Sequence, residues 1–139
     1  MKKKESVSQI ASTGLITIQL GQKLSEARKL MQVNQIHHVP VLQGTKLMGI
    51  LSAVDLATLS LTSFGSDEQA NDTMLDKQFS VEEVMSKNMV TIKPTTQIRE
   101  AAEILAEGHF HSLPMVDQEG NLQGLVTSTD LIRYLLSQY

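Results

Sequence analysis

The spacing of apolar residues predicts one amphipathic helix in each half of the chain. The apolar positions that follow the i, i+3, i+4, i+7 spacing are Ile98, Ala101, Ala102 and Leu105. Gly108 comes shortly after them, as is typical of a helix end. In the first half the same spacing is weaker, with Leu24, Ala27, Leu30 and Met31 on or near one face.

Short apolar runs bounded by turn residues predict two pairs of strands. The runs are 39–42 and 47–51 in the first half, and 113–116 and 122–126 in the second. Each pair flanks a polar turn that contains glycine, which is the pattern of a β-hairpin. Pro40 and Pro114 stand near the start of one strand in each pair. Because proline cannot donate to a β-ladder, we expect these two strands at sheet edges.

The second half of the chain repeats the first. The residues that recur 74 positions later are Thr17 as Thr91, Ile18 as Ile92, Ala27 as Ala101, His37 as His111 and Pro40 as Pro114. Gly49–Asp55 recurs as Gly124–Asp130, 75 positions later, and the additional residue falls in the hairpin turn, where a change of length is tolerated. The order strand, helix, strand, strand, helix is therefore predicted twice, in an α+β chain.

Two further segments lie outside this repeated order. Residues 62–78 are rich in Ser, Asp, Asn and Gln, which predicts an acidic linker that in part extends the preceding helix. The chain ends in the run 131–136, which has more apolar residues than a terminal helix in contact with water needs. We expect this helix to pack on the other copy or on another chain.

The strand-to-helix junctions carry the candidate chemistry. In each, a hydroxyl is followed three residues later by a carboxylate: Ser52 and Asp55, then Thr127 and Asp130. This spacing forms a helix capping box, in which both side chains bind backbone N–H groups. The same junction offers free N–H groups and the positive end of the helix dipole to an anion, and the aspartate offers acceptors for a ribose diol. Capping and ligand binding both remain open interpretations.

These repeated motifs resemble those of the CBS domain, a regulatory unit found in tandem pairs. The matching stretches are Ile36–Val41 with Gly49–Asp55, and Phe110–Met115 with Gly124–Asp130. Val81–Met85 also resembles the lead-in to a CBS repeat, and Val7–Ala11 corresponds to it in the first copy. The resemblance implies two β-α-β-β-α repeats that pack through their sheets with pseudo-twofold symmetry. The implied bounds are 1–61 for the first repeat, 62–79 for the linker and 80–139 for the second repeat.

The resemblance also implies the ligand-binding residues. In nucleotide-binding CBS domains the aspartate of the junction holds the ribose hydroxyls and the hydroxyl residue lies near phosphate. A basic residue often stands two positions before the proline; here it is His38 in the first copy but Ser112 in the second, where His111 is the neighbouring candidate. The complete candidate set is Thr17, Ile18, His38, Val39, Val41, Ser52 and Asp55, then Thr91, Ile92, His111, Leu113, Met115, Thr127 and Asp130. For the apolar members of this set, which would line an adenine cleft, ordinary core is the competing interpretation.

Composition restricts the class of protein. The 139 residues include 12 basic and 15 acidic side chains, so no broad positive field is available for a nucleic acid or an anionic membrane. The chain has no cysteine, no signal-peptide core and no apolar run long enough to span a membrane, and we expect a cytoplasmic protein. No phosphate loop, nucleophile elbow or zinc motif occurs, and His109 with His111 lacks a third ligand, so we expect neither an enzyme nor a metal site.

Taken together, the sequence predicts a regulatory module that binds an adenine nucleotide or a related adenosyl compound between the repeats. The candidate ligands are AMP, ADP, ATP, S-adenosylmethionine and cyclic dinucleotides. The ligand signal would pass to a separate protein, which the sequence does not name, and the chain would form a homodimer. The alternative is a ligand-free scaffold that dimerises through its helices and supports a partner protein.

Overall fold

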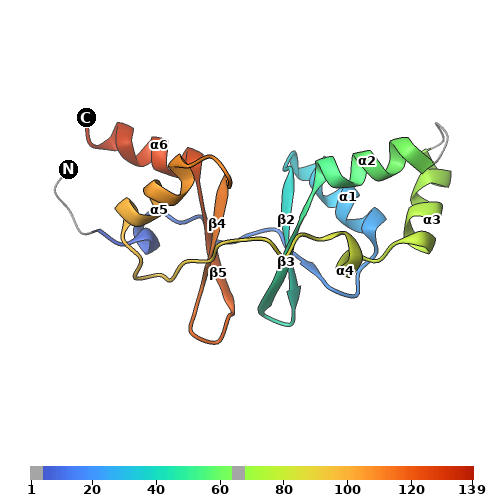
Figure 1. The fold of residues 1–139 in the computed structure, drawn as a ribbon, viewed down its shortest axis with the longest axis horizontal. Helices are drawn as coiled ribbons and strands as arrows, with labels where there is room; N and C mark the ends of the chain where they lie inside the picture. The colour runs from blue at the N-terminus through green and yellow to red at the C-terminus, as the bar shows by residue number, and fades with distance from the viewer. Residues whose placement is uncertain (1–4, 64–67) are drawn as a thin grey trace. The chain divides into compact units, whose positions relative to one another are not determined.

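The computed structural model describes the backbone of residues 5–63 and 68–139, and the side chains of these residues except 60–63 and 68–71 (Figure 1). The chain divides into two compact units. Unit 1 contains the N-terminal segment up to Leu15, Thr45–Leu47 and Met89–Tyr139, and unit 2 contains Ile16–Gly44 and Met48–Asn88. Each unit therefore combines most of one copy of the repeat with a segment from elsewhere in the chain.

Unit 2 holds the first copy in the predicted order. Its elements are β1 (Ile18–Gln19), α1 (Leu24–Asn34), β2 (His38–Gln43), β3 (Lys46–Ser52), α2 (Ala53–Ser63), α3 (Glu68–Gln78) and α4 (Val81–Val84). The sheet order is β1-β2-β3, and β1 runs parallel to β2 with Ile18 opposite Val41. The predicted apolar face of α1 is confirmed, because Leu24, Ala27 and Met31 are buried in the core.

Unit 1 holds the second copy. Its elements are a short 3-10 helix η1 (Val7–Gln9), α5 (Ile98–Ala106), β4 (Ser112–Val116), β5 (Leu122–Thr127) and α6 (Ser128–Ser137). Figure 1 shows β4 and β5 as a hairpin, and α5 contacts both β4 and α6. The predicted first strand shortens to Ile92, which bridges to Met115 in parallel. The predicted order is thus kept, with one bridge in place of a strand.

The expectation that proline marks an edge strand is wrong for the first copy. β2, which carries Pro40, is the central strand of its sheet. The missing N–H is tolerated because β1 is two residues long and lies opposite Val41 and Leu42, beyond the proline. In the second copy β4 does lie at the edge of a two-stranded sheet, and Pro114 uses its carbonyl to accept from the Ile92 N–H at 2.9 Å.

Most of the segment predicted as a linker is helical. Within α3, Leu75 is fully buried in the core of unit 2. Asp76 accepts hydrogen bonds from the N–H of Ser25 at 2.9 Å and from its hydroxyl at 2.5 Å. Lys23, the N-cap residue of α1, makes no side-chain capping bond of its own. The linker helix therefore supplies a cap to a helix start that lies 51 residues earlier in the chain.

The two lead-in segments, which the structure extends to residues 7–14 and 81–88, pack with the opposite copies. Val7 of the first lead-in is buried in the core of unit 1. Ser12 follows it and pairs with Leu125 of β5, through N–H···O bonds of 2.8 and 3.0 Å. Ser86 of the second lead-in pairs in the same way with Ile50 of β3, at 2.9 and 2.8 Å, within unit 2. Each lead-in thus adds a bridge to the hairpin of the copy to which it does not belong in sequence.

Glycine at one strand position permits this pairing in both copies. A Cβ added to Gly124 would lie 2.8 Å from the carbonyl oxygen of Ser12, and one added to Gly49 would lie 2.8 Å from that of Ser86. Real Cβ contacts this short essentially do not occur, so any other residue would push the lead-in away from the strand. The repeated glycine of the motif is therefore explained by a close approach of two backbones.

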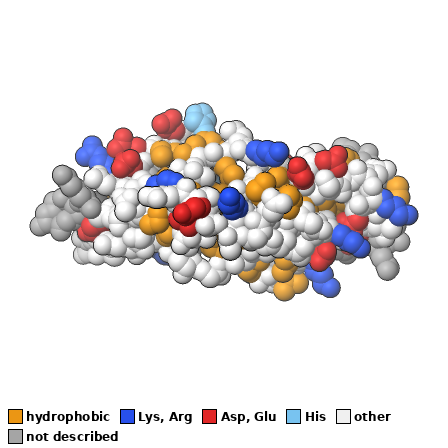
Figure 2. All heavy atoms as spheres, turned by 90° about the horizontal axis from the view of Figure 1, so that it is seen from below, with side chains coloured by type: hydrophobic (Ala, Val, Ile, Leu, Met, Phe, Trp, Pro, Cys, Tyr) orange, Lys and Arg blue, Asp and Glu red, His pale blue; other side chains and the backbone are white. Residues whose placement is uncertain are grey.

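Charges of both signs are spread over the surface. On the face that Figure 2 shows, basic and acidic side chains alternate and neither sign forms a single patch. Together with the net charge of −3, this leaves no broad attraction for a polyanion. Within residues 5–63 and 68–139, none of the helices combines the length and the apolar character that crossing a membrane requires.

Gly124→Ala is expected to destabilise the protein by about 1–3 kcal/mol, because the added methyl overpacks the contact with the Ser12 backbone. Urea unfolding followed by circular dichroism measures this change. Gly21→Ala is the matched control: nothing lies within 4 Å of its added methyl, and its change should stay within about 0.5 kcal/mol. Equal effects of the two substitutions would contradict the close-approach explanation.

Candidate functional site

The start of α6 is closed by a complete capping box. Thr127, the N-cap residue, has an extended backbone with φ −110° and ψ 165°. Its hydroxyl oxygen accepts from the Asp130 N–H at 3.1 Å, and the Asp130 Oδ2 accepts from the Thr127 N–H at 2.9 Å. Two backbone donors that the helix itself cannot satisfy are thereby paired. In the second copy the capping interpretation of the motif is confirmed.

The start of α2 has the same hydroxyl cap but a different carboxylate. The Ser52 hydroxyl oxygen accepts from the Asp55 N–H at 3.1 Å. The Asp55 side chain is exposed, and among the described residues the reciprocal bond back to the N-cap is not formed. The first copy therefore keeps one half of the capping box and leaves its carboxylate facing solvent.

Backbone carbonyls take the first N–H of each of these helices. The Ala53 N–H donates to the carbonyl of His37 at 2.8 Å, and the Ser128 N–H donates to that of His111 at 3.2 Å. Since the hydroxyl cap takes the third N–H, the N–H of the second helical residue is the next donor at each helix start. This donor and the helix dipole are the groups that an anion would meet there.

Asp130 is also held by the first lead-in. Its side chain is 9% exposed, and the Ser12 hydroxyl donates to both of its carboxylate oxygens, at 3.3 and 3.4 Å. Ser86, the residue equivalent to Ser12, behaves differently: its hydroxyl oxygen accepts from the Asn88 N–H at 3.1 Å. The two candidate aspartates therefore lie in unlike surroundings, although the motifs around them are alike.

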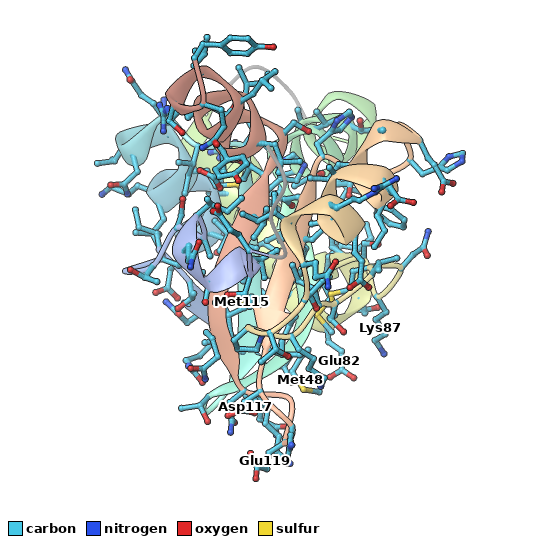
Figure 3. The ribbon with its side chains drawn as sticks, turned by 90° about the vertical axis from the view of Figure 1, so that its left-hand side faces the viewer. Met48, Glu82, Lys87, Met115, Asp117 and Glu119 are labelled. Atoms are coloured by element: carbon cyan, nitrogen blue, oxygen red, sulfur yellow. The ribbon has the colours of Figure 1, made fainter. Side chains whose placement is uncertain are left out.

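The apolar candidates are packed as core. All six are buried, in two separate clusters, with Ile18, Val39 and Val41 in unit 2 and Ile92, Leu113 and Met115 in unit 1. The structure brings Ile18 opposite Val41 and Ile92 opposite Met115. Figure 3 shows Met115 within the hairpin whose turn carries Asp117 and Glu119. Of the two threonines beside these residues, Thr17 is half-buried and Thr91 is exposed.

The histidines lie at the strand starts, with exposed side chains. His38 opens β2, and His111 immediately precedes β4, in which Ser112 is half-buried. Over the part of the chain that the structure describes, no three His, Asp or Glu side chains gather in a way that could hold a metal ion. As charged groups near a phosphate, His38 and His111 stay predictions.

A hollow of about 480 Å³ lies beside Asp130 in unit 1. Its other lining residues are Glu5, Gln9, Ile10, Arg133, Tyr134 and Ser137. Desolvation raises the pKa of the Tyr134 hydroxyl, and a hydrogen bond with Glu5 together with the charge of Glu5 raises it further. The single hydrogen of the Tyr134 hydroxyl therefore goes to Glu5, and Tyr134 has no second hydrogen to donate to Asp130.

The duplication of the chain is also found when its sequence is compared with known families. The model of the CBS domain matches the chain twice, over residues 7–61 and 81–137. The chain belongs to the CBS-domain family. The fold expected from the resemblance, a tandem CBS pair, is thereby confirmed.

Relatives of this CBS pair include proteins of similar length. A CBS domain-containing protein of Dictyostelium discoideum is 33% identical over 133 residues, which cover 94% of this chain and 90% of the relative. The crystal structure of CBSX2 in complex with AMP has a TM-score of 0.79 at 22% identity, covering 96% of this chain and 97% of that chain; CBSX2 is from Arabidopsis thaliana.

A second solved CBS pair holds two adenosyl compounds. The CBS domain pair of protein MJ0100, in complex with 5′-methylthioadenosine and S-adenosyl-L-methionine, has a TM-score of 0.77 at 24% identity. The match covers 99% of this chain and all of that chain, 100%. At this identity the likeness of both structures shows the fold.

Reasoning from the sequence missed two residues at the second aspartate. Ser12 was not singled out, although it and Ser86 stand 74 positions apart, at the same offset as the rest of the CBS repeat. Tyr134 follows Asp130 by four positions, so its place on the same helix face could have been found from spacing. The spacing could not predict that each lead-in packs with the opposite copy, which is what brings Ser12 to Asp130.

Asp130→Ala is expected to lower the free energy of unfolding by about 1 kcal/mol more than Asp55→Ala. Both substitutions remove a charge that favours the helix dipole, but only Asp130 also pairs with a backbone N–H. Urea unfolding of the two variants and the wild type measures the difference. Equal losses would show that the half-formed and complete capping boxes are energetically the same.

Proposed function

We propose that this CBS pair is a regulatory module of the cytoplasm that binds an adenine nucleotide or a related adenosyl compound and signals to a separate protein, without catalysing a reaction. The observation that carries the proposal is the duplicated helix start, where a hydroxyl, an aspartate and a backbone donor lie together in each copy. CBSX2 with AMP, and MJ0100 with 5′-methylthioadenosine and S-adenosyl-L-methionine, support this class of ligand. AMP, ADP, ATP, S-adenosylmethionine and cyclic dinucleotides are the candidates.

The first copy offers the more open set of groups. The exposed Asp55 carboxylate can accept from both hydroxyls of a ribose. Ser52 accepts from the backbone with a lone pair, so its own hydrogen is available to donate to a phosphate oxygen. The N–H of Val54 at the helix start and His38, when protonated, would add to the attraction for phosphate.

An adenine base can reach fewer of the candidate residues than the sequence predicts, because some of them are fully buried. Val39 and Val41 are both 0% exposed, so a base would reach them only after neighbouring side chains move. Thr17 and Thr91 are not buried and are the members of the set that a ligand meets first. We therefore propose that the polar groups at the helix starts provide most of the ligand contacts, and that the apolar residues form the walls of the adenine cleft.

Regulation would require that the ligand binds two states of the protein with different affinity. A ligand shifts an equilibrium between two conformations or oligomeric states only by the difference in its affinity for them. The partner that would read this shift is a separate protein. Neither nucleic acid nor membrane is proposed as the primary partner, because the net charge is −3 and charges of both signs are interspersed on the face that Figure 2 shows.

Calorimetric titration with the five candidate ligands should detect at least one that binds with a Kd below a millimolar. Asp55→Ala and Asp130→Ala are each expected to weaken or abolish binding at one site, by roughly tenfold or more, because hydrogen bonds to a charged group contribute about 1.5–3 kcal/mol. Glu103→Ala, an exposed carboxylate on α5, is the control and should bind as the wild type does. Binding that survives in the Asp55→Ala/Asp130→Ala double variant would refute the assignment of the site.

A second function is favoured by the outer face of α6. Three apolar residues of α6 follow the i, i+3, i+4 spacing, Ile132, Leu135 and Leu136, and are 58, 43 and 67% exposed; Tyr139, two residues beyond the end of the helix, is 98% exposed. We call this set the α6 stripe. At the equivalent positions, 75 residues earlier, the first copy has Ala57, Ser60, Leu61 and Phe64, so a small and a polar side chain stand where the second copy has isoleucine and leucine.

We propose that the α6 stripe meets the same stripe of a second copy of this chain. Burying four such side chains on each partner removes roughly 1,000 Å² in total from water, at the lower bound for a specific interface. Each chain has one stripe, and a twofold pairing uses it on both partners, so association stops at a dimer. A scaffold that dimerises in this way is the alternative function, and it is compatible with ligand sensing.

Leu136→Glu is expected to convert a dimer into a monomer, because it places a charge in the centre of the α6 stripe. Size-exclusion chromatography with light scattering gives the mass of each species. Val33→Glu is the matched control, since Val33 is also apolar and 70% exposed but lies on α1. A wild type that is monomeric at every concentration, or a Leu136→Glu variant that stays dimeric, would refute this pairing.

A further inference from the structure

The aspartate of the second copy is already occupied by a side chain of the protein itself. Ser12 Oγ lies 3.3 Å from Asp130 Oδ1 and 3.4 Å from Oδ2, so its single hydrogen is shared between both oxygens. Oδ2 also accepts from the Thr127 N–H at 2.9 Å. A ribose diol at this carboxylate would need to donate to the same two oxygens that Ser12 now contacts.

The backbone fixes the position from which Ser12 acts. Its N–H and carbonyl both bind Leu125, at 2.8 and 3.0 Å, and Gly124 allows that approach because it has no Cβ. The Cβ of Ser12 is therefore held beside Asp130 whenever the lead-in is paired with β5, and rotation about the Cα–Cβ bond decides whether the hydroxyl reaches the carboxylate. The position of the Cβ does not depend on the contact with the carboxylate.

The first copy shows that the fold does not impose this contact. Ser86 has the same two backbone bonds, to Ile50, and the same close glycine, Gly49. Its hydroxyl oxygen nevertheless accepts from the Asn88 N–H, and Asp55 is exposed. The residue two positions after Ser12 is Gly14, with φ +65°, and Asn88 stands at the equivalent place in the second lead-in. The two lead-ins thus differ at the second position after the serine.

We propose that Ser12 is an internal competitor for the ligand-binding oxygens of Asp130, and so lowers the affinity of the second copy for an adenosyl ligand. This inference rests on the proposed function, because it concerns the same aspartate. Ser12 is a positioning residue here: it acts on the ligand through Asp130 and makes no contact with the ligand in the bound state.

The geometry makes this competition reversible. Distances of 3.3 and 3.4 Å are longer than the 2.5–3.0 Å typical of O–H···O bonds, so the shared bond is weak. Ser12 is exposed, and its hydroxyl would be hydrated once displaced, while its backbone stays paired with Leu125. A ligand therefore displaces one hydroxyl and leaves the lead-in in place.

The test isolates the second site and removes the competitor. In the Asp55→Ala background, AMP, ADP, ATP, S-adenosylmethionine and cyclic dinucleotides are titrated by calorimetry into chains with Ser12, Ser12→Ala or Ser12→Thr. Ser12→Ala is expected to tighten binding by roughly three- to tenfold, the range for losing one competing hydrogen bond. Ser12→Thr keeps a hydroxyl and should restore the affinity of the parent. In the Asp130→Ala background, Ser86→Ala is the matched control and should leave affinity unchanged.

The outcomes separate this inference from the function on which it rests. Binding that requires Asp130 but is unchanged or weakened by Ser12→Ala overturns the competitor and leaves the proposed function standing. Absence of binding by all five candidate ligands in every variant overturns both. A structural role alone would lower the melting temperature of the ligand-free Ser12→Ala chain without tightening binding, so thermal unfolding without ligand accompanies each titration. Tighter binding on Ser86→Ala of the same size would also overturn the inference, because Ser86 does not touch Asp55.

Discussion

The structure depends on the close approach of a lead-in backbone to a strand backbone, which occurs once in each copy. A lead-in carbonyl oxygen lies only 2.8 Å from the position that a Cβ would take, at Gly49 and again at Gly124. This approach lets Ser86 and Ser12 form paired backbone bonds with Ile50 and Leu125. Because these strands run directly into α2 and α6, the same contact determines which groups stand beside the helix starts. The candidate chemistry is thus built around a contact that the motif glycine makes possible.

The two copies have the same backbone arrangement at the helix start, but their aspartates lie in different surroundings. In both copies a backbone carbonyl takes the first N–H of the helix and a hydroxyl takes the third. The carboxylates then differ: Asp130 is nearly buried, with a backbone and a side-chain donor, whereas Asp55 faces solvent. A carboxylate that already has donors must exchange them for those of a ligand, while an exposed one exchanges only water. Under the proposed function, the two repeats would in this way bind one compound at different concentrations.

The sequence was sufficient for the order of elements and for the position of the helix starts. The duplication is visible as residues that recur 74–75 positions later, and the two CBS matches confirm it. The apolar spacing of residues 98–105 is a local period, and helix α5 confirms it. The edge position of Pro40 was wrong because the length of β1, which decides whether a missing N–H matters, is set by tertiary pairing. The hold of Ser12 on Asp130 spans 118 positions, and no local pattern encodes such a contact. The candidate site could be located from the sequence, but its occupation by the chain itself could not.

The cap that Asp76 provides to α1 limits where the chain can be cut without loss of buried residues. The helix start at Ser25 is completed only by a residue 51 positions later, and Val81, still farther on, is part of the same core. Val7, at the other end of the chain, belongs to the core of the second copy. A cut at either repeat boundary would therefore remove buried residues from both halves. The smallest segment that keeps both hydrophobic cores complete, for example in a fusion protein, is therefore the whole CBS pair.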